Sequence, residues 1–522
     1  MKHANDCQCS VNKNFQLKII GHYPGTCPRH KVEVIHLPTP LPAHLSEYYF
    51  YHQNCIHNVL SALVGRVARC VPSPTPANLK RLVALSRKLG TSLGSTIPIT
   101  YEQVIESYRG FRRKRYERAH DKIKRFGFNK DPTVSMFVKM EGIKYSPEKI
   151  NPDCRAIQFR KPEFGLTLGR YIKPIEHKLY KAIGPHPYPK TQFIAKNLNP
   201  AQRANLLSSK YQAMSGCVMY EFDVTRFDAH VTEDLIKVEQ ACYEAMNSDA
   251  EFAQLLKLKR KTKGKVRGDT WTVKYKLKGG RMSGDMDTAS SNCAIMATVL
   301  ALLSEVLGVR CDFVVDGDDS VFFCSDHTIP DSFFFQFFKD CGLTIKIDNK
   351  TTDLSKVTFC QSRLVQLADR QVMIRDPTKL MSKLTINPKF DKDAAKLLEV
   401  ICLGELSIVS GCPVIDPFLR KMLGVARKFT EGKNKLLGSK EWMDYRQRRD
   451  VHGDWWKLKV TPITPQSRTS FMSSWGWSIY DQHEFEGALD RIEIDLTNEL
   501  IRDEGMDVGR WLTDCFMREF TN

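Results

Sequence analysis

The chain has 522 residues, 42% of them hydrophobic, which is enough apolar material to bury a large core in roughly two to four structural units. Lys and Arg outnumber Asp and Glu by 78 to 59, so the net charge is +19 and nucleic acid is the first candidate partner. The sixteen cysteines show no disulfide-framework spacing and no secretory signal opens the sequence, so free thiols in a reducing compartment are expected. The longest apolar run, Cys293 to Leu303, is shorter than the roughly 20 residues that cross a bilayer, so no transmembrane segment is expected.

Residues 1–77 are predicted to form an N-terminal extension, rich in proline with His and Cys between the prolines. Cys7, Cys9, Cys27 and His30 form a CxC and CPRH pattern. Such side chains can enclose Zn²⁺ tetrahedrally, but the first pair is closer than the usual two-residue gap. A zinc site and free thiols in a loose arm therefore both stay open.

The middle of the chain alternates predicted helices and strands. A basic helical pattern begins at Tyr101, and strands in MFVKMEG and CRAIQFR lead to a helix that begins near Leu168. The run VMYEFD predicts a strand that ends in a turn, and a helix follows from Glu233 to Met246. The basic stretch after that helix favours a β-hairpin with Gly264 and Gly268 near its turns.

A long helix is predicted from about Thr288 to Leu307, and CDFVVDGDDSVFFC follows it as two strand-like runs around Asp316, Asp318 and Asp319. A glycine with positive φ in a hairpin turn lets flanking carboxylates converge at the tip. A solvated Asp-Gly turn would explain this triplet alone, but Asp223 ends another apolar strand. Two adjacent strand-end carboxylates can hold two Mg²⁺ ions roughly 4 Å apart, which is the arrangement for nucleotidyl transfer. The chain beyond about 380 is predicted to be mostly helical.

The motifs DxxxxD, SGxxxTxxxN and GDD occur in this order, and the ordered set resembles viral RNA-dependent RNA polymerases. The stretches GGRMSGDMDTASSN, FCQSRLV and CRAIQFRKPEFGLTLGRYIKPIEHKLY narrow the resemblance to the replicases of tombusviruses and related positive-strand RNA viruses. The resemblance runs from about Tyr101 to Gln366, and Asp316 stands where that family usually has an uncharged residue.

This resemblance implies an α+β fold, the right-hand polymerase, with fingers, a palm of antiparallel sheet plus helices, and a mostly helical thumb. The implied boundaries are an N-terminal extension at 1–77, fingers at 78–214, a first palm part at 215–250, a fingers insertion at 251–279, a second palm part at 280–380, and a thumb with C-terminal region at 381–522.

The resemblance also implies the catalytic residues. Asp223 and Asp318 would be the principal ligands of Mg²⁺ or Mn²⁺, Asp319 would support them, and the backbone carbonyl of Val224 would contribute. Protonation of the departing pyrophosphate would use a general acid, for which Lys346 is preferred.

Substrate-binding residues follow from the same motifs. Asp228 and Asn292 are expected to detect the 2′-hydroxyl, and Thr288 shares a helix face with Asn292. Ser283 and Gly284 would let the backbone approach template and nucleotide closely.

Cations are expected around the triphosphate. Lys139, Arg155 and Arg160 would form the roof of the nucleotide channel, with Arg155 the best match to the phosphate-binding arginine. Basic groups from Lys257 to Arg267 are expected to line the RNA path.

The predicted reaction is template-directed addition of ribonucleoside monophosphates from NTPs to an RNA 3′ end during viral genome replication. A reverse transcriptase is disfavoured by Asp228 with Asn292, and an inactive RNA-binding scaffold by the intact carboxylates. The expected partners are template and nascent RNA, NTPs, and a viral or host replication partner. Since related replicases work on membranes, we expect the chain to reach membrane-associated complexes in the host cytoplasm through that partner or another segment.

Overall fold

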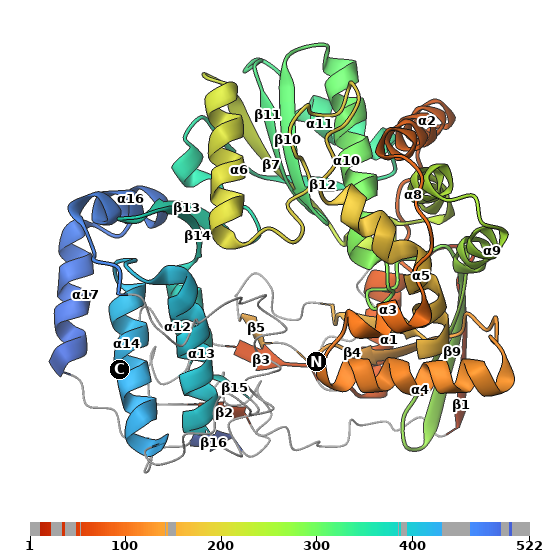
Figure 1. The fold of residues 1–522 in the computed structure, drawn as a ribbon, viewed down its shortest axis with the longest axis horizontal. Helices are drawn as coiled ribbons and strands as arrows, with labels where there is room; N and C mark the ends of the chain where they lie inside the picture. Colours follow the sequence, from red (N-terminus) through yellow and green to blue (C-terminus); the bar gives the residue numbers. More distant parts are fainter. Residues whose placement is uncertain are drawn as a thin grey trace, which may run out of the picture.

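The computed structural model describes residues 11–21, 34–36, 49–52, 54–140, 142–144, 153–384, 386–387, 394–430, 460–491 and 501–503. Two main sheets lie in separate parts of the molecule, and helices pack around both of them (Figure 1). The fold is therefore α+β with mainly antiparallel sheets, as predicted.

A four-stranded antiparallel sheet carries the acidic hairpin. Its strands run in the order β10 (Cys311–Asp316), β11 (Asp319–Cys324), β7 (Val218–Val224) and β12 (Ile345–Thr351). The apolar runs of β10, β11 and β7 are almost fully buried, as expected for strands covered on both faces. Both the VMYEFD strand and the hairpin around the GDD triplet were predicted correctly.

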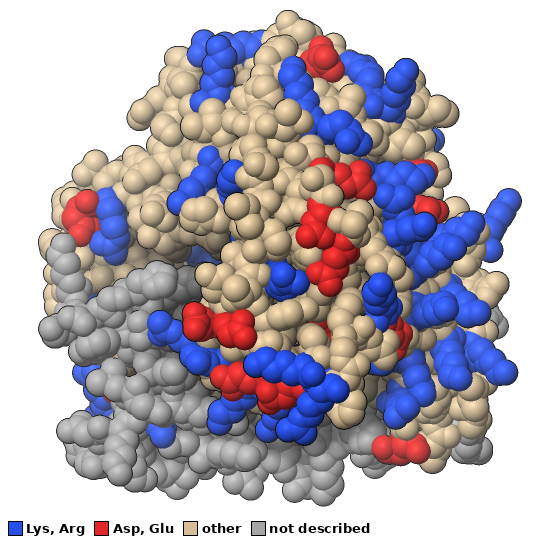
Figure 2. Space-filling model, turned by 45° about the vertical axis from the view of Figure 1, so that its right-hand side comes forward, with Lys and Arg blue, Asp and Glu red and all other residues tan. Residues whose placement is uncertain are grey.

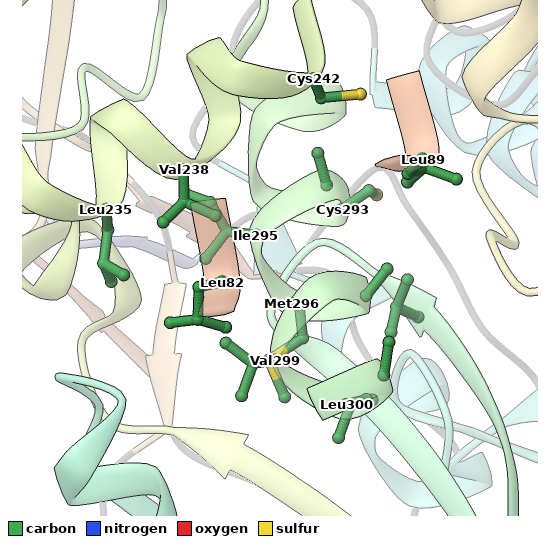
Figure 3. Packing of buried hydrophobic residues seen from close by; sticks show 14 of the residues in the cluster. Leu82, Leu89, Leu235, Val238, Cys242, Cys293, Ile295, Met296, Val299 and Leu300 are labelled. Atoms are coloured by element: carbon green, nitrogen blue, oxygen red, sulfur yellow. The ribbon is translucent and has the colours of Figure 1, made fainter. Parts of the chain in front are cut away.

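Helix α10 (Thr288–Leu307) forms the centre of the largest hydrophobic core and has the predicted bounds. It packs against α2 (Pro76–Leu93) and α8 (Glu233–Met246), whose leucines and valines face it in Figure 3. Among the described residues α10 is the one helix long and apolar enough to cross a bilayer, but 78% of its most apolar stretch is buried within the protein. A core helix has this property.

The second main sheet has five strands. Their order is β1 (Gln16–Gly21), β9 (Trp271–Lys278), β8 (Lys261–Arg267), β4 (Val134–Val138) and β6 (Ala156–Arg160). Strands β8 and β9 are the predicted basic hairpin, and each alternates buried with exposed residues. Gly264 lies within β8 rather than at a turn. A glycine is needed at this position because the ring of Tyr275 on β9 occupies the space that a Cβ would fill.

Helix α5 (Pro162–Leu179) begins six residues before the predicted start at Leu168. Proline at the first helical position and Glu163 in the first turn both favour a helix start there. The other helices of this half are α1 (Ile56–Ala62), the π-helical turn η3 (Leu63–Val67), α3 (Tyr101–Glu106), α4 (Gly110–Phe126), α6 (Pro200–Ala213), α7 (Phe227–His230), α9 (Ala250–Lys259) and α11 (Asp331–Asp340).

The C-terminal part is mostly helical, as predicted, and has its own hydrophobic core. Its helices are α12 (Pro377–Leu384), α13 (Ala394–Val409), α14 (Ile415–Thr430), α16 (Pro465–Trp475) and α17 (Ile479–Arg491). The 3₁₀ turn η5 (Leu354–Lys356) and the hairpin of β13 (Ser362–Gln366) and β14 (Gln371–Arg375) connect it to the four-stranded sheet. Two small sheets complete the fold, one of β3 (Tyr49–Tyr51) with β5 (Gly142–Lys144) and one of β15 (Ile386–Asn387), β2 (Val34–His36) and β16 (Ile501–Asp503).

Candidate active site

The GDD triplet forms the tip of the β10–β11 hairpin. Asp316 and Asp319 are the last paired residues, and Gly317 and Asp318 form the turn between them. Gly317 has φ of 77°, and positive φ at the first turn position is typical of a type II′ turn, which favours glycine there. Asp318 and Asp319 are both exposed at this tip.

Asp223 reaches the same place from the neighbouring strand. In the register of β7 with β11, Phe222 pairs with Ser320, so the next residues along each strand, Asp223 and Asp319, are adjacent. Enclosure by the protein, followed by the charges of Asp318, Asp316 and Asp223, raises the pKa of Asp319 to about 6. The structure therefore brings together the predicted carboxylates.

The unusual Asp316 is neutralised within the protein. Its carboxylate is buried, forms an ion pair with Arg203 of α6, and lies 3.1 Å from Lys196 Nζ. Cys360 Sγ also approaches this carboxylate at 3.7 Å. The two cations balance the negative charge of the Asp316 carboxylate. The pair with Arg203 also connects the hairpin tip to α6.

A cavity of about 550 Å³ opens beside the carboxylates. Strands β7, β11 and β12 and the segment before β13 provide its wall, and the wall contains Asp223, Asp319, Lys350, Gln361 and Arg363. The cavity is thus bordered by both acidic and basic side chains.

Lys346 and Val224 lie next to this site. Lys346 is exposed on β12 and is the register partner of Asp223, so it is adjacent to the carboxylates. Val224 is the last residue of β7 and its side chain is buried. Within the described ranges, no three His, Cys, Asp or Glu side chains lie close enough together to hold a metal ion by themselves.

Asp228 belongs to the short helix α7, which begins after Arg226 in the left-handed conformation. Its carboxylate is accessible to solvent, yet enclosure by the surrounding protein raises its pKa. Arg281 and Arg155 act in the opposite direction and Asp318 adds to the rise, so these three charged groups lie around Asp228. Arg226 pairs with Asp153 instead.

Asn292 is held by a buried group of charges that we call the ion cluster, composed of Glu239, Lys259, Arg281 and Asp287. Arg281 Nε donates to Asn292 Oδ1 at 2.8 Å, and Arg281 also pairs with Glu239. Lys259 pairs with Asp287 and lies 3.4 Å from Glu239. With its oxygen engaged, the amide of Asn292 keeps its nitrogen available as a donor.

The segment before α10 is joined to the free edge of β6. Gly284 N donates to Gln158 O at 2.7 Å, and Ser283 Oγ donates to Ala156 O at 3.1 Å. A Cβ on Gly284 would lie 2.8 Å from Gln158 O, so glycine is needed for this close approach. The Thr288 hydroxyl donates to carbonyl groups of the same segment, at 2.6 Å to Met282 O, and so stabilises the start of α10.

The three predicted phosphate-binding cations have different surroundings. Arg155 is exposed at the start of β6, and the charge interaction places it near Asp228. Lys139 follows β4, and its backbone N donates to Arg155 O at 2.7 Å. Arg160 is buried, pairs with Asp285, and lies over the ring of Phe164, so its guanidinium is engaged inside the protein.

Several residues of the site were not predicted. Arg281 is part of GGRMSG, and a signal for it was Glu239, a carboxylate on an otherwise apolar face of α8 that requires a buried cation. Lys196 and Arg203 could have been sought because a buried Asp316 also needs a cation. Cys7, Cys9, Cys27 and His30 lie outside the described residues.

Known proteins match this chain over most of its length. It is 29% identical over 471 residues to the RNA-directed RNA polymerase of Turnip crinkle virus. The matched residues make up 85% of this chain and 58% of that protein. The RNA-directed RNA polymerase of Groundnut rosette virus is 29% identical over 398 residues, with 75% of this chain and 46% of that protein covered. The one from Tobacco necrosis virus (strain D) is 26% identical over 475 residues, with 87% and 64% covered.

The chain spans about half the length of the first two of these relatives. The profile of the family described as viral RNA-dependent RNA polymerase matches residues 27–497, which include every described element from β2 to α17. The chain therefore belongs to the viral RNA-dependent RNA polymerase family.

Proposed function

We propose that this chain adds ribonucleoside monophosphates to an RNA 3′ end under the direction of an RNA template, during replication of a viral genome. The observation that carries the proposal is the convergence of Asp223, Asp318 and Asp319 at neighbouring strand ends, beside Asp228 and Arg155. Family membership and the names of the relatives agree with it.

The carboxylates fit a site for Mg²⁺ or Mn²⁺. Hard divalent cations prefer oxygen ligands, and Asp223, Asp318 and Asp319 provide them, with the Val224 carbonyl as a further donor. Burial and then repulsion from the neighbouring carboxylates raise the pKa of Asp319, and a bound cation would relieve that repulsion. Phosphate oxygens and water would complete the ligand shells, since the described protein groups do not enclose an ion alone. Such ions would stabilise the attacking and leaving oxygens of nucleotidyl transfer.

Asp228 and Asn292 are proposed to recognise the ribose. The Asp228 carboxylate accepts a hydrogen bond from the 2′-hydroxyl, and the Asn292 amide nitrogen donates one to it. Arg281 acts on both, by its charge at Asp228 and by its hydrogen bond to Asn292. We therefore regard Arg281 as a positioning residue for sugar recognition.

The basic residues around the active-site carboxylates are proposed to bind the triphosphate of the incoming nucleotide. Arg155 is exposed and near Asp228, so its planar guanidinium can contact phosphate oxygens in two places. Lys139 adjoins it through the backbone. Lys346, beside Asp223 on β12, is the proposed donor of a proton to the departing pyrophosphate. Arg160 supports β6 from inside, through Asp285.

The right-hand assignment is also a proposal. The four-stranded sheet with α10 corresponds to the palm at 215–250 and 280–380, the five-stranded sheet lies mainly in the fingers at 78–214 and 251–279, and the helices after 380 form the thumb. The proposed partners are template and nascent RNA, NTPs, and a replication partner that recruits the chain to membranes in the host cytoplasm.

Incorporation of labelled nucleotides on a short RNA template, with Mg²⁺ or Mn²⁺, tests the proposal. Asp318→Ala should abolish incorporation and leave RNA binding largely intact, because it removes a metal ligand rather than a basic contact. Asp326→Ala is the control, since Asp326 follows the same hairpin at the end away from the tip and its carboxylate accepts hydrogen bonds from the neighbouring Thr328. Wild-type extension by Asp318→Ala would show that the site is misassigned, and extension of DNA products from deoxynucleotides alone would favour a reverse transcriptase.

A further inference from the structure

The exposed face of the five-stranded sheet is covered with cations. Strands β8 and β9 direct every second side chain to this face, and we call these side chains the basic ladder: Lys261, Lys263, Lys265, Arg267, Lys274, Lys276 and Lys278. Within the described part of the chain, none of them forms an ion pair with a carboxylate. Figure 2 shows Lys and Arg side chains crowding the right-hand side of the view, with few acidic side chains between them.

The register places ladder cations directly opposite one another. Lys261 pairs with Lys278, Lys263 with Lys276, and Lys265 with Lys274, while Lys18 of β1 extends the last of these rows. Like charges at opposing positions destabilise a sheet. The pKa of Lys265 is lowered, first by desolvation and then by Arg267 and Lys274. A bound polyanion would remove this repulsion.

Two aromatic rings lie on the same face, next to the ladder. Lys265 is level with Ser135 of β4, which pairs with Phe159 of β6, so one row crosses the sheet from cations to an aromatic ring. Phe137 is 42% exposed and contacts Phe159 edge to face, with ring centroids 6.0 Å apart. Arg115 of α4 lies over the Phe159 ring at 5.4 Å.

The ladder strands lie apart from the segment before α10. That segment is bonded to the edge strand β6, where a Cβ on Gly284 would lie 2.9 Å from Phe159 Cβ, and β4 separates β6 from β8 and β9. The opposite face of the sheet carries Gln158, which is bonded to Tyr275, and Arg160, which pairs with Asp285 in the loop before α10. That inner face also packs on α1 and η3. The basic ladder is thus on strands that β4 separates from the sheet edge to which the segment before α10 is bonded.

We propose that this exposed face is a second RNA-binding surface, separate from the site of Asp223 and Asp318, on which the basic ladder contacts phosphates of single-stranded RNA while Phe137, supported by Phe159, stacks on its bases. Regularly spaced cations can neutralise the phosphates of an RNA backbone whatever its base sequence, and an exposed aromatic ring can stack on an unpaired base. A duplex keeps its bases stacked inside the helix, so the rings favour a single strand. The sequence predicted an RNA path along Lys257–Arg267. The structure places Lys261 to Arg267 on β8, whereas Lys257 and Lys259 are on α9 and Lys259 is buried in the ion cluster.

Charge reversal within the ladder gives a distinctive test. In the double variant Lys263→Glu and Lys265→Glu, each new carboxylate faces a lysine, so two like-charged pairs become attractive and the melting temperature should stay equal or rise. Binding of an unstructured oligouridylate of about 12 nucleotides, measured without NTPs, should weaken. The slope of log affinity against log salt concentration should fall in magnitude by about 1.4, which corresponds to two lost phosphate contacts.

The matched control is Lys80→Glu with Lys339→Glu. Both lysines are exposed on helices outside this sheet, and the change in net charge is the same. Equal loss of affinity in the control and ladder variants would overturn the proposal, because it would reduce the effect to net charge. Because no nucleotide is present, the outcome is independent of whether the chain catalyses RNA synthesis.

Phe137→Ala tests the aromatic part. Loss of one stacked base should weaken oligouridylate binding at least about fivefold, with no change in the salt slope. Crosslinks from 4-thiouridine RNA should map to Phe137 of β4 and to the ladder strands β8 and β9. Crosslinks confined to the cleft would overturn the proposal. So would ladder variants that lose binding to phosphatidylserine vesicles and keep oligouridylate binding, since the face would then be a membrane surface.

Discussion

Replacement of Arg281 by methionine tests how the ion cluster supports sugar recognition. The cluster contains two carboxylates and two cations, all with side chains at most 3% exposed. Arg281→Met leaves two buried carboxylates facing one ammonium. Removal of one partner from a buried pair destabilises a protein by about 3–5 kcal/mol. We expect a loss near the lower end, about 3 kcal/mol, because Lys259 Nζ remains 3.4 Å from Glu239.

The double variant Arg281→Met and Glu239→Gln restores the charge balance, with Asp287 and Lys259 still paired. Urea denaturation should therefore show that the free energy of unfolding recovers by roughly 2 kcal/mol relative to the single variant. The preference for ribonucleotides should not recover, because Asn292 Oδ1 still lacks the donor at 2.8 Å. The measure is the ratio of kcat/KM for a ribonucleotide and its 2′-deoxy analogue.

Arg81→Met provides a control. The pair of Arg81 with Glu305 is exposed on both sides, so the loss should be below about 1 kcal/mol. If Arg281→Met is no less stable than this control, or if the double variant is no more stable than the single one, charge balance does not stabilise the cluster. An unchanged ratio of specificity constants in both Arg281 variants would contradict its positioning role.

Three further predictions concern the cleft and its surroundings. Asp228→Ala and Asn292→Ala should each lower the ribonucleotide to deoxynucleotide ratio of kcat/KM, because a site that hydrogen-bonds a hydroxyl rejects the analogue without it; a wild-type ratio in both would leave Asp228 a structural carboxylate. Arg155→Ala should weaken nucleotide use by about 1.5–3 kcal/mol and template binding much less; unchanged KM and kcat would place Arg155 outside the channel. Burial lowers the pKa of His230 to about 4, so between pH 6.5 and 4 the unfolded chain binds the proton more readily and the free energy of unfolding falls with decreasing pH. His230→Gln should flatten urea midpoints over this range, and an equal slope in both proteins would assign the effect to other groups.

Elements with a strong local pattern were predictable from the sequence. Helices α8 and α10 have the predicted bounds because their apolar residues are dense, and α10 ends at Gly308 in the left-handed conformation. The β10–β11 hairpin was predictable because Gly317 suits the first position of its turn. The adjacency of Asp223 to this turn was inferred from its position at the end of an apolar strand and from the family resemblance, and the register of β7 agrees with it.

Contacts between distant segments were not predictable in this way. The ion cluster joins Glu239 on α8 to Arg281 in a loop, and no local pattern encodes such a pairing. Asp316 was noted as unusual, but its cations are on and before α6, far earlier in the chain. The early start of α5 was missed because the helical period is clear only after Leu168, whereas proline and Glu163 determine where the helix begins. The fingers, palm and thumb boundaries stay predictions.

Different elements hold the carboxylates and the sugar-recognition groups, so chemistry and selection should be separable by substitution. Asp223, Asp318 and Asp319 are held by strand register in one sheet. Asn292 is held through Arg281 and the ion cluster, and the loop before α10 is held by the edge of β6 through Gly284. Helix α10 also touches the hairpin tip, because Gly317 N donates to Cys293 Sγ at 3.1 Å, so a selective variant has to change the loop or the ion cluster and leave α10 in place. Variants of the loop and cluster should change which nucleotide is used, whereas variants of the hairpin should change whether any nucleotide is used.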